Sequence, residues 1–158
     1  MGTTNLFPAD GVLDLNAPNK SGLLQILAAE AATRLGCPEE EVLSALQARE
    51  ALGSTALGRG IALPHARMEG IQAPVALLAR LRKPIEFEAK DGEPVDLVFL
   101  VIWPTEATEG FLPALSDICR VLREPQVPRQ LRQAKSPQEA LDMLRETGLV
   151  GPARTAGE

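Results

Sequence analysis

The chain has 158 residues, 45% of them hydrophobic but only 3% aromatic, and it carries a formal net charge of −5. This length suffices for one domain with a conventional hydrophobic core. The acidic balance and the shortage of aromatic rings on which bases could stack argue against a nucleic-acid-binding protein. No apolar run approaches the ~18 residues of a membrane span, so we expect no membrane insertion.

The few cysteine and histidine residues indicate a protein without a metal site. Cys37 and Cys119 lie far apart in helical contexts, which is typical of reduced, packed thiols in the cytoplasm. His65 is the only histidine, and no close cysteine pair accompanies it, so we expect neither a metal nor a cofactor. The N-terminus lacks the basic start and apolar segment of a secretory signal, which also favours a cytoplasmic location.

The N-terminal part of the chain is predicted to hold a short strand and a helix. Residues 1–10 are rich in glycine, threonine, asparagine and proline, and we expect them to be flexible. Residues 12–15 favour a short edge strand. Ser21 is the expected N-cap of a helix that ends at Leu35, with Gly36 just beyond it.

A second helix is predicted to start at Pro38 as its first residue, followed by three glutamates that suit a helix N-terminus. The apolar stripe of this helix is Val42, Leu43 and Leu46. Arg49 falls in its last turn. A cation there could serve the helix dipole, but we favour a role at a phosphate group.

Strand-like segments occupy the middle of the chain. Residues 74–81 form a mostly apolar run, and residues 85–87 alternate as a half-buried strand would. Residues 90–92 (Lys-Asp-Gly) indicate a hairpin turn or part of a longer loop. Residues 95–103 form the most apolar run, which is typical of a central strand covered on both faces, and Pro104 ends it.

The C-terminal part is predicted to be helical. Thr108 or Glu109 is expected near the cap of a third helix, with Pro113 in its first turn. The predicted core face of this helix is Leu112, Leu115, Ile118, Cys119 and Leu122. A short helix is expected at 127–134, and a capping box at 136–139 starts a last helix that ends before Gly148. Together these elements predict one α/β domain over residues 11–147, with a flexible tail at 148–158.

The strongest functional signal lies between Arg49 and Arg67. His65 follows a short apolar run, and Pro64 predicts that the strand stops where His65 emerges. A lone histidine after a strand is often only structural, but here the neighbours are typical of a phosphate site. They comprise two hydroxyls, two glycines that allow close backbone approach, and three guanidiniums: Ser54, Thr55, Gly58, Gly60, Arg49, Arg59 and Arg67.

This stretch also carries a family resemblance. The pattern Arg49-Glu50-x3-Ser54-Thr55-x2-Gly58-x-Gly60-Ile61-Ala62-x-Pro64-His65-Ala66-Arg67 closely resembles the signature of enzyme IIA domains of the bacterial phosphotransferase system, fructose/mannitol type. The similarity extends from about Lys20 to about Glu146. It implies one domain with a mixed β-sheet flanked by helices.

The resemblance also implies a function for His65. In this family the histidine takes phosphate through Nε2 from the phosphocarrier protein HPr or its nitrogen-branch variant, so the chain would be a phosphotransferase component and not a stand-alone catalyst. A free-standing chain of this length resembles the nitrogen-regulatory subgroup, whose phosphorylation state controls partner proteins. In sugar-transporting members the next acceptor is a cysteine of an enzyme IIB.

Phosphoryl transfer depends mainly on positioning and on stabilising charge over three equatorial oxygens. Five residues could supply the necessary donors without a metal: Arg49 through its guanidinium, Ser54 and Thr55 through their hydroxyls, and Gly58 and Gly60 through backbone amides.

One residue departs from the family pattern. Phe111 stands where a second histidine usually faces the first. Losing one charge-assisted donor of this kind is worth ~2 kcal/mol, or tens-fold in rate. Three alternatives to the regulatory phosphoryl carrier therefore stay open: an IIA-like binding module with weak or lost phosphotransfer, a sugar-specific IIA that passes phosphate to a IIB cysteine, and an unrelated hydrolase. For the hydrolase, the sequence places no nucleophile or carboxylate to complete a triad with His65.

Overall fold

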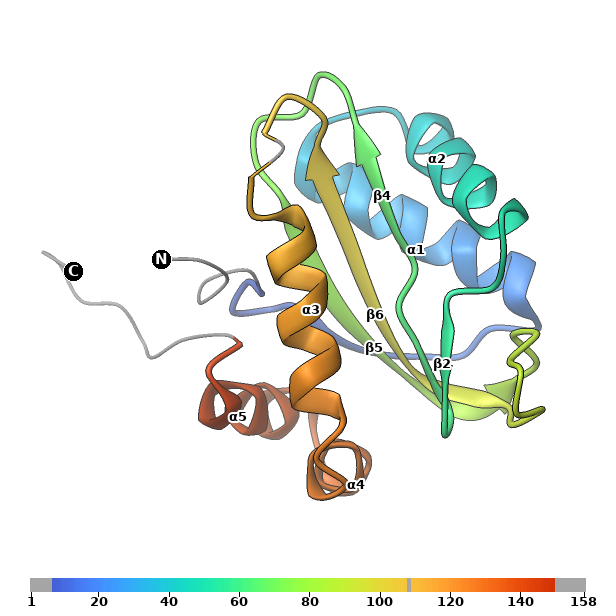
Figure 1. The fold of residues 1–158 in the computed structure, drawn as a ribbon, viewed down its shortest axis with the longest axis vertical. Coiled ribbons are helices and arrows are strands. Elements are labelled where there is room, and N and C mark those ends of the chain that lie inside the picture. The colour runs from blue at the N-terminus through green and yellow to red at the C-terminus, as the bar shows by residue number, and fades with distance from the viewer. Residues whose placement is uncertain (1–6, 108, 150–158) are drawn as a thin grey trace, which may run out of the picture.

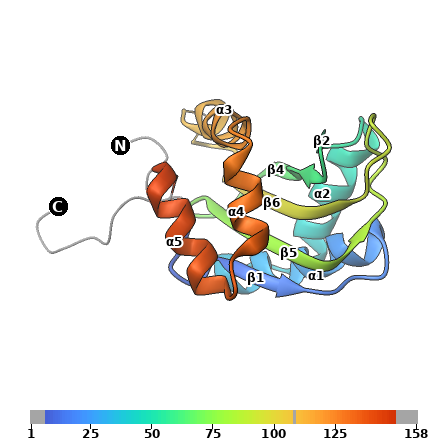
Figure 2. The same ribbon diagram turned by 90° about the horizontal axis from the view of Figure 1, so that it is seen from below.

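The computed structural model describes residues 7–107 and 109–149, in which a six-stranded mixed sheet lies between two groups of helices (Figures 1 and 2). The strands are β1 (Val12–Leu15), β2 (Ala56–Gly58), β3 (Ile61–Ala62), β4 (His65–Met68), β5 (Val75–Ile85) and β6 (Val95–Pro104). The helices are α1 (Lys20–Leu35), α2 (Glu39–Ala51), α3 (Phe111–Leu122), α4 (Gln126–Gln133) and α5 (Pro137–Thr147). The predicted α/β class and mixed sheet are confirmed.

Strand β6 is the centre of the sheet, as its apolar sequence predicted. The strand order is β1-β5-β6-β3-β2, and β4 also pairs with β6. Strand β5 runs antiparallel along one side of β6, while β3 and then β4 run parallel along the other. The predicted strand at 12–15 is β1, at one edge.

Strand β3 ends at Ala62, but His65 does not leave the sheet as the sequence suggested, because a new strand, β4, begins at this residue. Pairing with β6 pauses at Leu63 and Pro64 and resumes at His65, which lies opposite Val101. Pro64 cannot donate to the ladder, but its carbonyl still accepts a hydrogen bond from the Val101 amide at 3.0 Å. The proline therefore interrupts the ladder without turning the chain away from the sheet.

Helices cover both faces of β6, and this explains its uninterrupted run of apolar residues. Its side chains alternate between two cores, as the period of two in a strand requires. Leu97, Phe99, Val101 and Trp103 pack with α3, α4 and α5. Val98, Leu100 and Ile102 pack with α1 and α2.

Several helix ends agree with the predictions, and two start elsewhere. Gly36 ends α1 in a left-handed conformation, and Ser136 caps α5 by accepting the Glu139 amide at 3.1 Å. The N-cap of α1 is Asn19 and not the predicted Ser21, because the Asn19 side chain accepts the Gly22 amide at 2.8 Å. Pro38 is the N-cap of α2 and not its first residue, because its ψ of 138° is extended.

The core face of α3 differs from the predicted one. Gly110 is its N-cap, whereas Thr108 lies outside the described residues. Gly110 has φ 94°, and a Cβ there would come within 2.8 Å of the Trp103 ring. From this start, Phe111 is buried and Leu112 is 71% exposed. The buried residues are Phe111, Ala114, Ile118, Val121 and Leu122, with Leu115 and Cys119 partly buried beside them.

The last differences from the sequence-based expectations lie in the β5–β6 connection. The expected short strand at 85–87 does not form separately, because β5 runs to Ile85 and Phe87 lies beyond it in the core. The turn at 90–92 lies within a longer loop. Phe7 packs edge-on against Phe99, and Leu149 is buried. Residues 1–6 and 150–158 lie outside the described residues, so the domain bounds 11–147 and the flexible ends stay a prediction.

Candidate functional site

His65 is the first residue of β4, which lies between α2 and α3 (Figure 1). Arg49, in the last turn of α2, reaches it from one side, and Phe111, at the start of α3, faces it from the other. These three residues, separate in the sequence, were predicted to share a site, and the fold brings them together.

The hydrogen bonds of His65 define which nitrogen can act as a nucleophile. Its Nδ1 lies 2.7 Å from the carbonyl oxygen of Leu63. A carbonyl oxygen only accepts, so Nδ1 must carry the proton and Nε2 must hold the lone pair. The Arg49 Nε, at 3.3 Å, donates to Nε2 and agrees with this tautomer.

The surroundings of His65 also keep its ring neutral. Burial is the main effect and lowers the pKa of His65. The hydrogen bond to the Leu63 carbonyl raises this pKa in part, the Arg49 charge lowers it further, and the Glu50 charge raises it. Because the pKa lies below the ordinary 6.5, the ring is uncharged at neutral pH. A neutral, partly exposed imidazole whose Nε2 carries the lone pair is suited to nucleophilic attack.

Arg49 keeps part of its guanidinium available. Its Nη1 donates to the Gly53 carbonyl at 2.9 Å, which anchors the side chain to the end of α2. Within residues 7–107 and 109–149, Arg49 forms no ion pair with a carboxylate. Its charge is therefore free to attract an anion at Nε2 of His65.

Phe111 forms an aromatic wall beside the histidine. Its ring centroid lies 6.0 Å from that of His65 and 5.9 Å from that of Trp103. The residue is only 7% exposed. Trp103 is itself fixed by donation from Nε1 to the Ala107 carbonyl at 2.6 Å. Phe111 is thus a packed component of the site and offers no hydrogen-bond donor from its side chain.

The family model for the phosphoenolpyruvate-dependent sugar phosphotransferase system, EIIA 2, matches residues 7–147 of this sequence. The chain belongs to this family.

Individual relatives agree with the family match. A nitrogen regulatory protein of Bradyrhizobium diazoefficiens is 40% identical over 145 residues, which cover 91% of this chain and 95% of that protein. The crystal structure of nitrogen regulatory protein IIA-Ntr from Neisseria meningitidis superimposes with a TM-score of 0.83 at 31% identity, covering 88% and 96% of the two chains. A complex of mannitol enzyme IIA with phosphorylated mannitol enzyme IIB from Escherichia coli gives 0.74 at 18% identity, covering 89% and 99%, and shares the fold alone.

In this enzyme IIA chain the hydroxyls of Ser54 and Thr55 are already engaged. Ser54 Oγ donates to the Phe87 carbonyl at 2.6 Å and accepts the Ala56 amide at 3.1 Å. The Thr55 hydroxyl donates to the carboxylate of Glu50, which also accepts the Thr55 amide at 3.2 Å. The two residues lie near the site, but their hydroxyls hold the backbone in place.

A buried ion pair beneath Arg49 was not predicted. The Glu50 side chain is only 7% exposed and pairs with Lys20 Nζ at 2.9 Å. Lys20 also pairs with Glu88 and lies 4.5 Å over the Phe87 ring. These contacts tie the end of α2, next to Arg49, to the start of α1 and to residues 87–88. The one sequence signal was the position of Glu50 inside the family motif.

The structure does not bring Gly58 and Gly60 to His65. Gly58 is the last residue of β2, and Gly60 lies in the two-residue turn to β3, where Arg59 (φ 57°) and Gly60 (φ 81°) have the positive φ of a type I′ turn. Gly60 lies five residues before His65 along an extended chain, roughly 16 Å away. A Cβ on Gly60 would meet Arg132 at 2.6 Å, so the glycine serves this turn.

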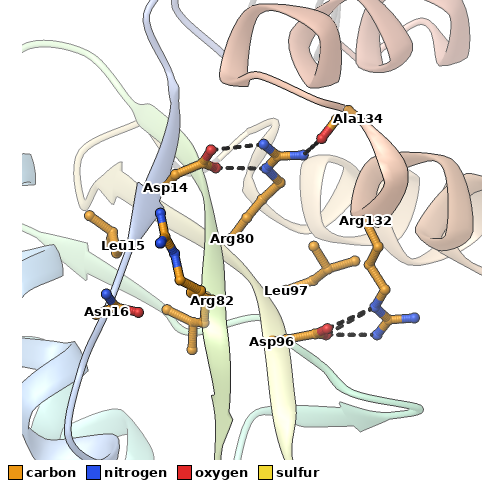
Figure 3. Close-up of a pocket in the computed structure, with 10 residues that line it drawn as sticks. Asp14, Leu15, Asn16, Arg80, Arg82, Asp96, Leu97, Arg132 and Ala134 are labelled. Atoms are coloured by element: carbon orange, nitrogen blue, oxygen red, sulfur yellow. Dashed lines mark hydrogen bonds and ion pairs between the residues drawn. The ribbon is translucent and has the colours of Figure 1, made fainter.

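A polar pocket of about 380 Å³ lies at the other end of β6 (Figure 3). Its arginines are mostly paired: Arg80 forms two bonds to Asp14, and Arg132 binds Asp96. Arg80 also donates to the carbonyls at the end of α4. These ion pairs fasten α4 to the sheet.

No group of three or more histidine, cysteine, aspartate or glutamate side chains in residues 7–107 and 109–149 could hold a metal ion. Likewise, no helix there combines the length and hydropathy needed to cross a bilayer.

Proposed function

We propose that this chain is a regulatory phosphoryl carrier that accepts a phosphoryl group on Nε2 of His65 from an HPr-type phosphocarrier. The observation that carries the proposal is the pair of contacts on the imidazole: Nδ1 against the Leu63 carbonyl and Arg49 at Nε2. This arrangement leaves a lone pair and a positive charge at the same point.

The proposed transfer follows from these contacts. Nε2 of His65 attacks the phosphorus of the donor's phosphohistidine, and the donor's N–P bond breaks with its electron pair returning to the donor imidazole. As the new bond forms, positive charge develops on the His65 ring, and the Leu63 carbonyl stabilises it through the Nδ1 proton. Arg49 stabilises the negative charge on the equatorial oxygens.

A partner-binding surface is proposed around His65. Leu52, three residues after Arg49, is 84% exposed, and Leu112, the residue after Phe111, is also exposed. Solvent-exposed leucines on both sides of the histidine suit a protein partner that must approach His65 closely. The donor and a downstream partner would use the same surface in turn.

For the downstream step we favour control of partner proteins by phosphorylation state, because the similar proteins bear the name nitrogen regulatory protein. The alternative is transfer to a IIB cysteine, supported by the solved complex between a mannitol IIA and phosphorylated IIB. A cytoplasmic location stays a prediction.

The test is labelling with radioactive phosphoenolpyruvate, enzyme I and HPr. The parent chain should acquire an acid-labile, base-stable phosphate, and His65→Ala should acquire none. Circular dichroism of the variant controls for folding. A base-stable label that survives in His65→Ala would reject His65 as the acceptor.

One observation favours a second function, a binding module with lost phosphotransfer: the ring of Phe111 fills the position of a donor. A parent chain that remains unlabelled, yet binds HPr in titration calorimetry, would support this alternative.

A further inference from the structure

Arg67 lies on the same side of β4 as His65. Residues two apart in a strand face the same way, at roughly 7 Å between Cα atoms. The intervening Ala66 and the following Met68 are buried in the core of α1 and α2. His65 and Arg67 therefore both face α3, and Arg67 is exposed.

Arg67 and His65 contact the same aromatic ring. The guanidinium carbon of Arg67 lies 5.4 Å from the centroid of Phe111, within the range of a cation–π interaction. The imidazole of His65 is a neighbour of the same ring, with its centroid 6.0 Å from that of Phe111. Phe111 is fixed by burial against Trp103, so it forms a rigid support that holds the guanidinium near the histidine.

The donors of Arg67 are not used elsewhere. In the described part of the chain, Arg67 has neither an ion pair nor a hydrogen bond from its guanidinium. Stacking on an aromatic ring leaves the edge of a guanidinium free for bidentate contacts with phosphate oxygens. Arg49 approaches His65 from the end of α2, whereas Arg67 lies beyond it on β4.

We propose that Arg67, supported by the ring of Phe111, is a second cationic ligand of the phosphoryl group on His65. The inference rests on the proposed function. It assigns to Arg67 and Phe111 jointly the donor that an imidazole at position 111 would have supplied. Arg49 and Arg67 then hold the phosphoryl oxygens from two directions.

The experiment compares parent, Arg67→Gln, Arg67→Lys and the control Arg82→Gln. Arg82 is an exposed arginine at the far pocket, and its loss removes the same charge (Figure 3). Two quantities are measured: the single-turnover transfer rate at saturating phospho-HPr, and the pKa of the phosphate on His65 from ³¹P NMR of the isolated phosphoprotein. The second needs no partner and so separates phosphate contact from docking.

We expect Arg67→Gln to slow transfer at least tenfold and to raise the phosphate pKa, because a nearby cation favours the dianion. Arg67→Lys should recover part of both effects, and Arg82→Gln should show neither. An unchanged phosphate pKa in Arg67→Gln would overturn the proposal, even if the apparent affinity for HPr fell, because the residue would then serve docking alone.

The parent chain separates this inference from the proposed function. If HPr does not label the parent, the proposed function fails, and phosphoramidate is used to phosphorylate His65 chemically. The ³¹P titration of parent and Arg67→Gln then still decides whether Arg67 contacts the phosphate. A histidine that neither reagent phosphorylates would reject both proposals.

Discussion

Two arginine-rich regions of this molecule differ in what their guanidiniums contact. In the pocket at the start of β6, Arg80 and Arg132 are each bound to an aspartate (Figure 3). Beside His65, Arg49 and Arg67 form no ion pair with any carboxylate in the described residues. A well-formed pocket lined by arginines is therefore not by itself an anion-binding site. Charge that is already paired stabilises the fold, and charge left unpaired is available for a ligand.

The largest expected effect concerns Arg49, one of the two arginines without an ion pair beside His65. Arg49→Gln should slow phosphoryl transfer at least tenfold and up to the hundredfold that loss of one transition-state donor can cost. The melting temperature should stay within a few degrees, since the side chain forms no ion pair. Single-turnover labelling and thermal unfolding measure the two quantities. Equal labelling rates for variant and parent would contradict the role of Arg49.

Substitutions at the paired arginines should instead lower the stability of the fold and leave the transfer rate unchanged. Arg80→Gln removes the bonds to Asp14 and to the carbonyls of Leu131 and Ala134, so it should lower the free energy of unfolding by about 2 kcal/mol in urea titration. Asp14→Asn keeps the carbonyl contacts and should cost less. Labelling of either folded variant should match the parent. A slower transfer in Arg80→Gln would mean that the two regions are coupled.

A smaller effect is expected from Phe111→His. The imidazole adds a donor beside His65, but it removes the ring on which Arg67 stacks. We expect a rise of a few-fold at most in the transfer rate. In an Arg67→Gln background the same change should give a larger rise, because the added donor then replaces a lost one. Equal ratios in the two backgrounds would show that positions 67 and 111 act independently.

The smallest effect concerns the titration of His65 itself. Burial and the Arg49 charge lower its pKa, so the imidazole should become protonated only at a pH lower than the ordinary 6.5. The transfer rate should decline in that more acidic range. Arg49→Gln removes one of these causes, and the pKa should rise. Proton NMR of the single imidazole gives both values. A pKa that falls in Arg49→Gln would show that the guanidinium does not face the ring.

The lowered pKa of His65 also determines how the stability of the fold changes with pH. The folded state has the lower pKa, so between the two pKa values the unfolded chain binds more protons. The contribution of His65 is therefore complete above the unfolded value near 6.5 and is lost as the pH falls toward the folded value.

Local signals in the sequence predicted much of this fold. The apolar run of β6, the capping box at Ser136 and the glycine after α1 each depend on a few neighbouring residues, and all three are present. Arg49 was placed in the last turn of α2 for the same reason. The sharing of one site by Arg49, His65 and Phe111 came from the family motif, which local patterns alone would not have supplied.

What the sequence could not provide depends on contacts between distant residues. A glycine pair can bind phosphate or form a hairpin, and only the antiparallel pairing of β2 with β3 shows that Gly58 and Gly60 belong to a hairpin. The Ser54 hydroxyl is engaged by a carbonyl 33 residues away. Leu112 was predicted to be buried because its apolar character fits either face, but the helix has its N-cap at Gly110, against Trp103, and Phe111 is buried in its place.

The carbonyl that orients His65 belongs to Leu63, only two residues earlier, and the chain on both sides of this link is bound to β6. The acceptor nitrogen is therefore prepared by the strand itself, with no loop that must close and no helix that must shift. We expect the phosphorylated and unphosphorylated chains to share one backbone conformation. A partner that distinguishes the two forms would then have to recognise the added negative charge directly. Recognition of the phosphorylated form would depend on electrostatics and not on a change in backbone shape.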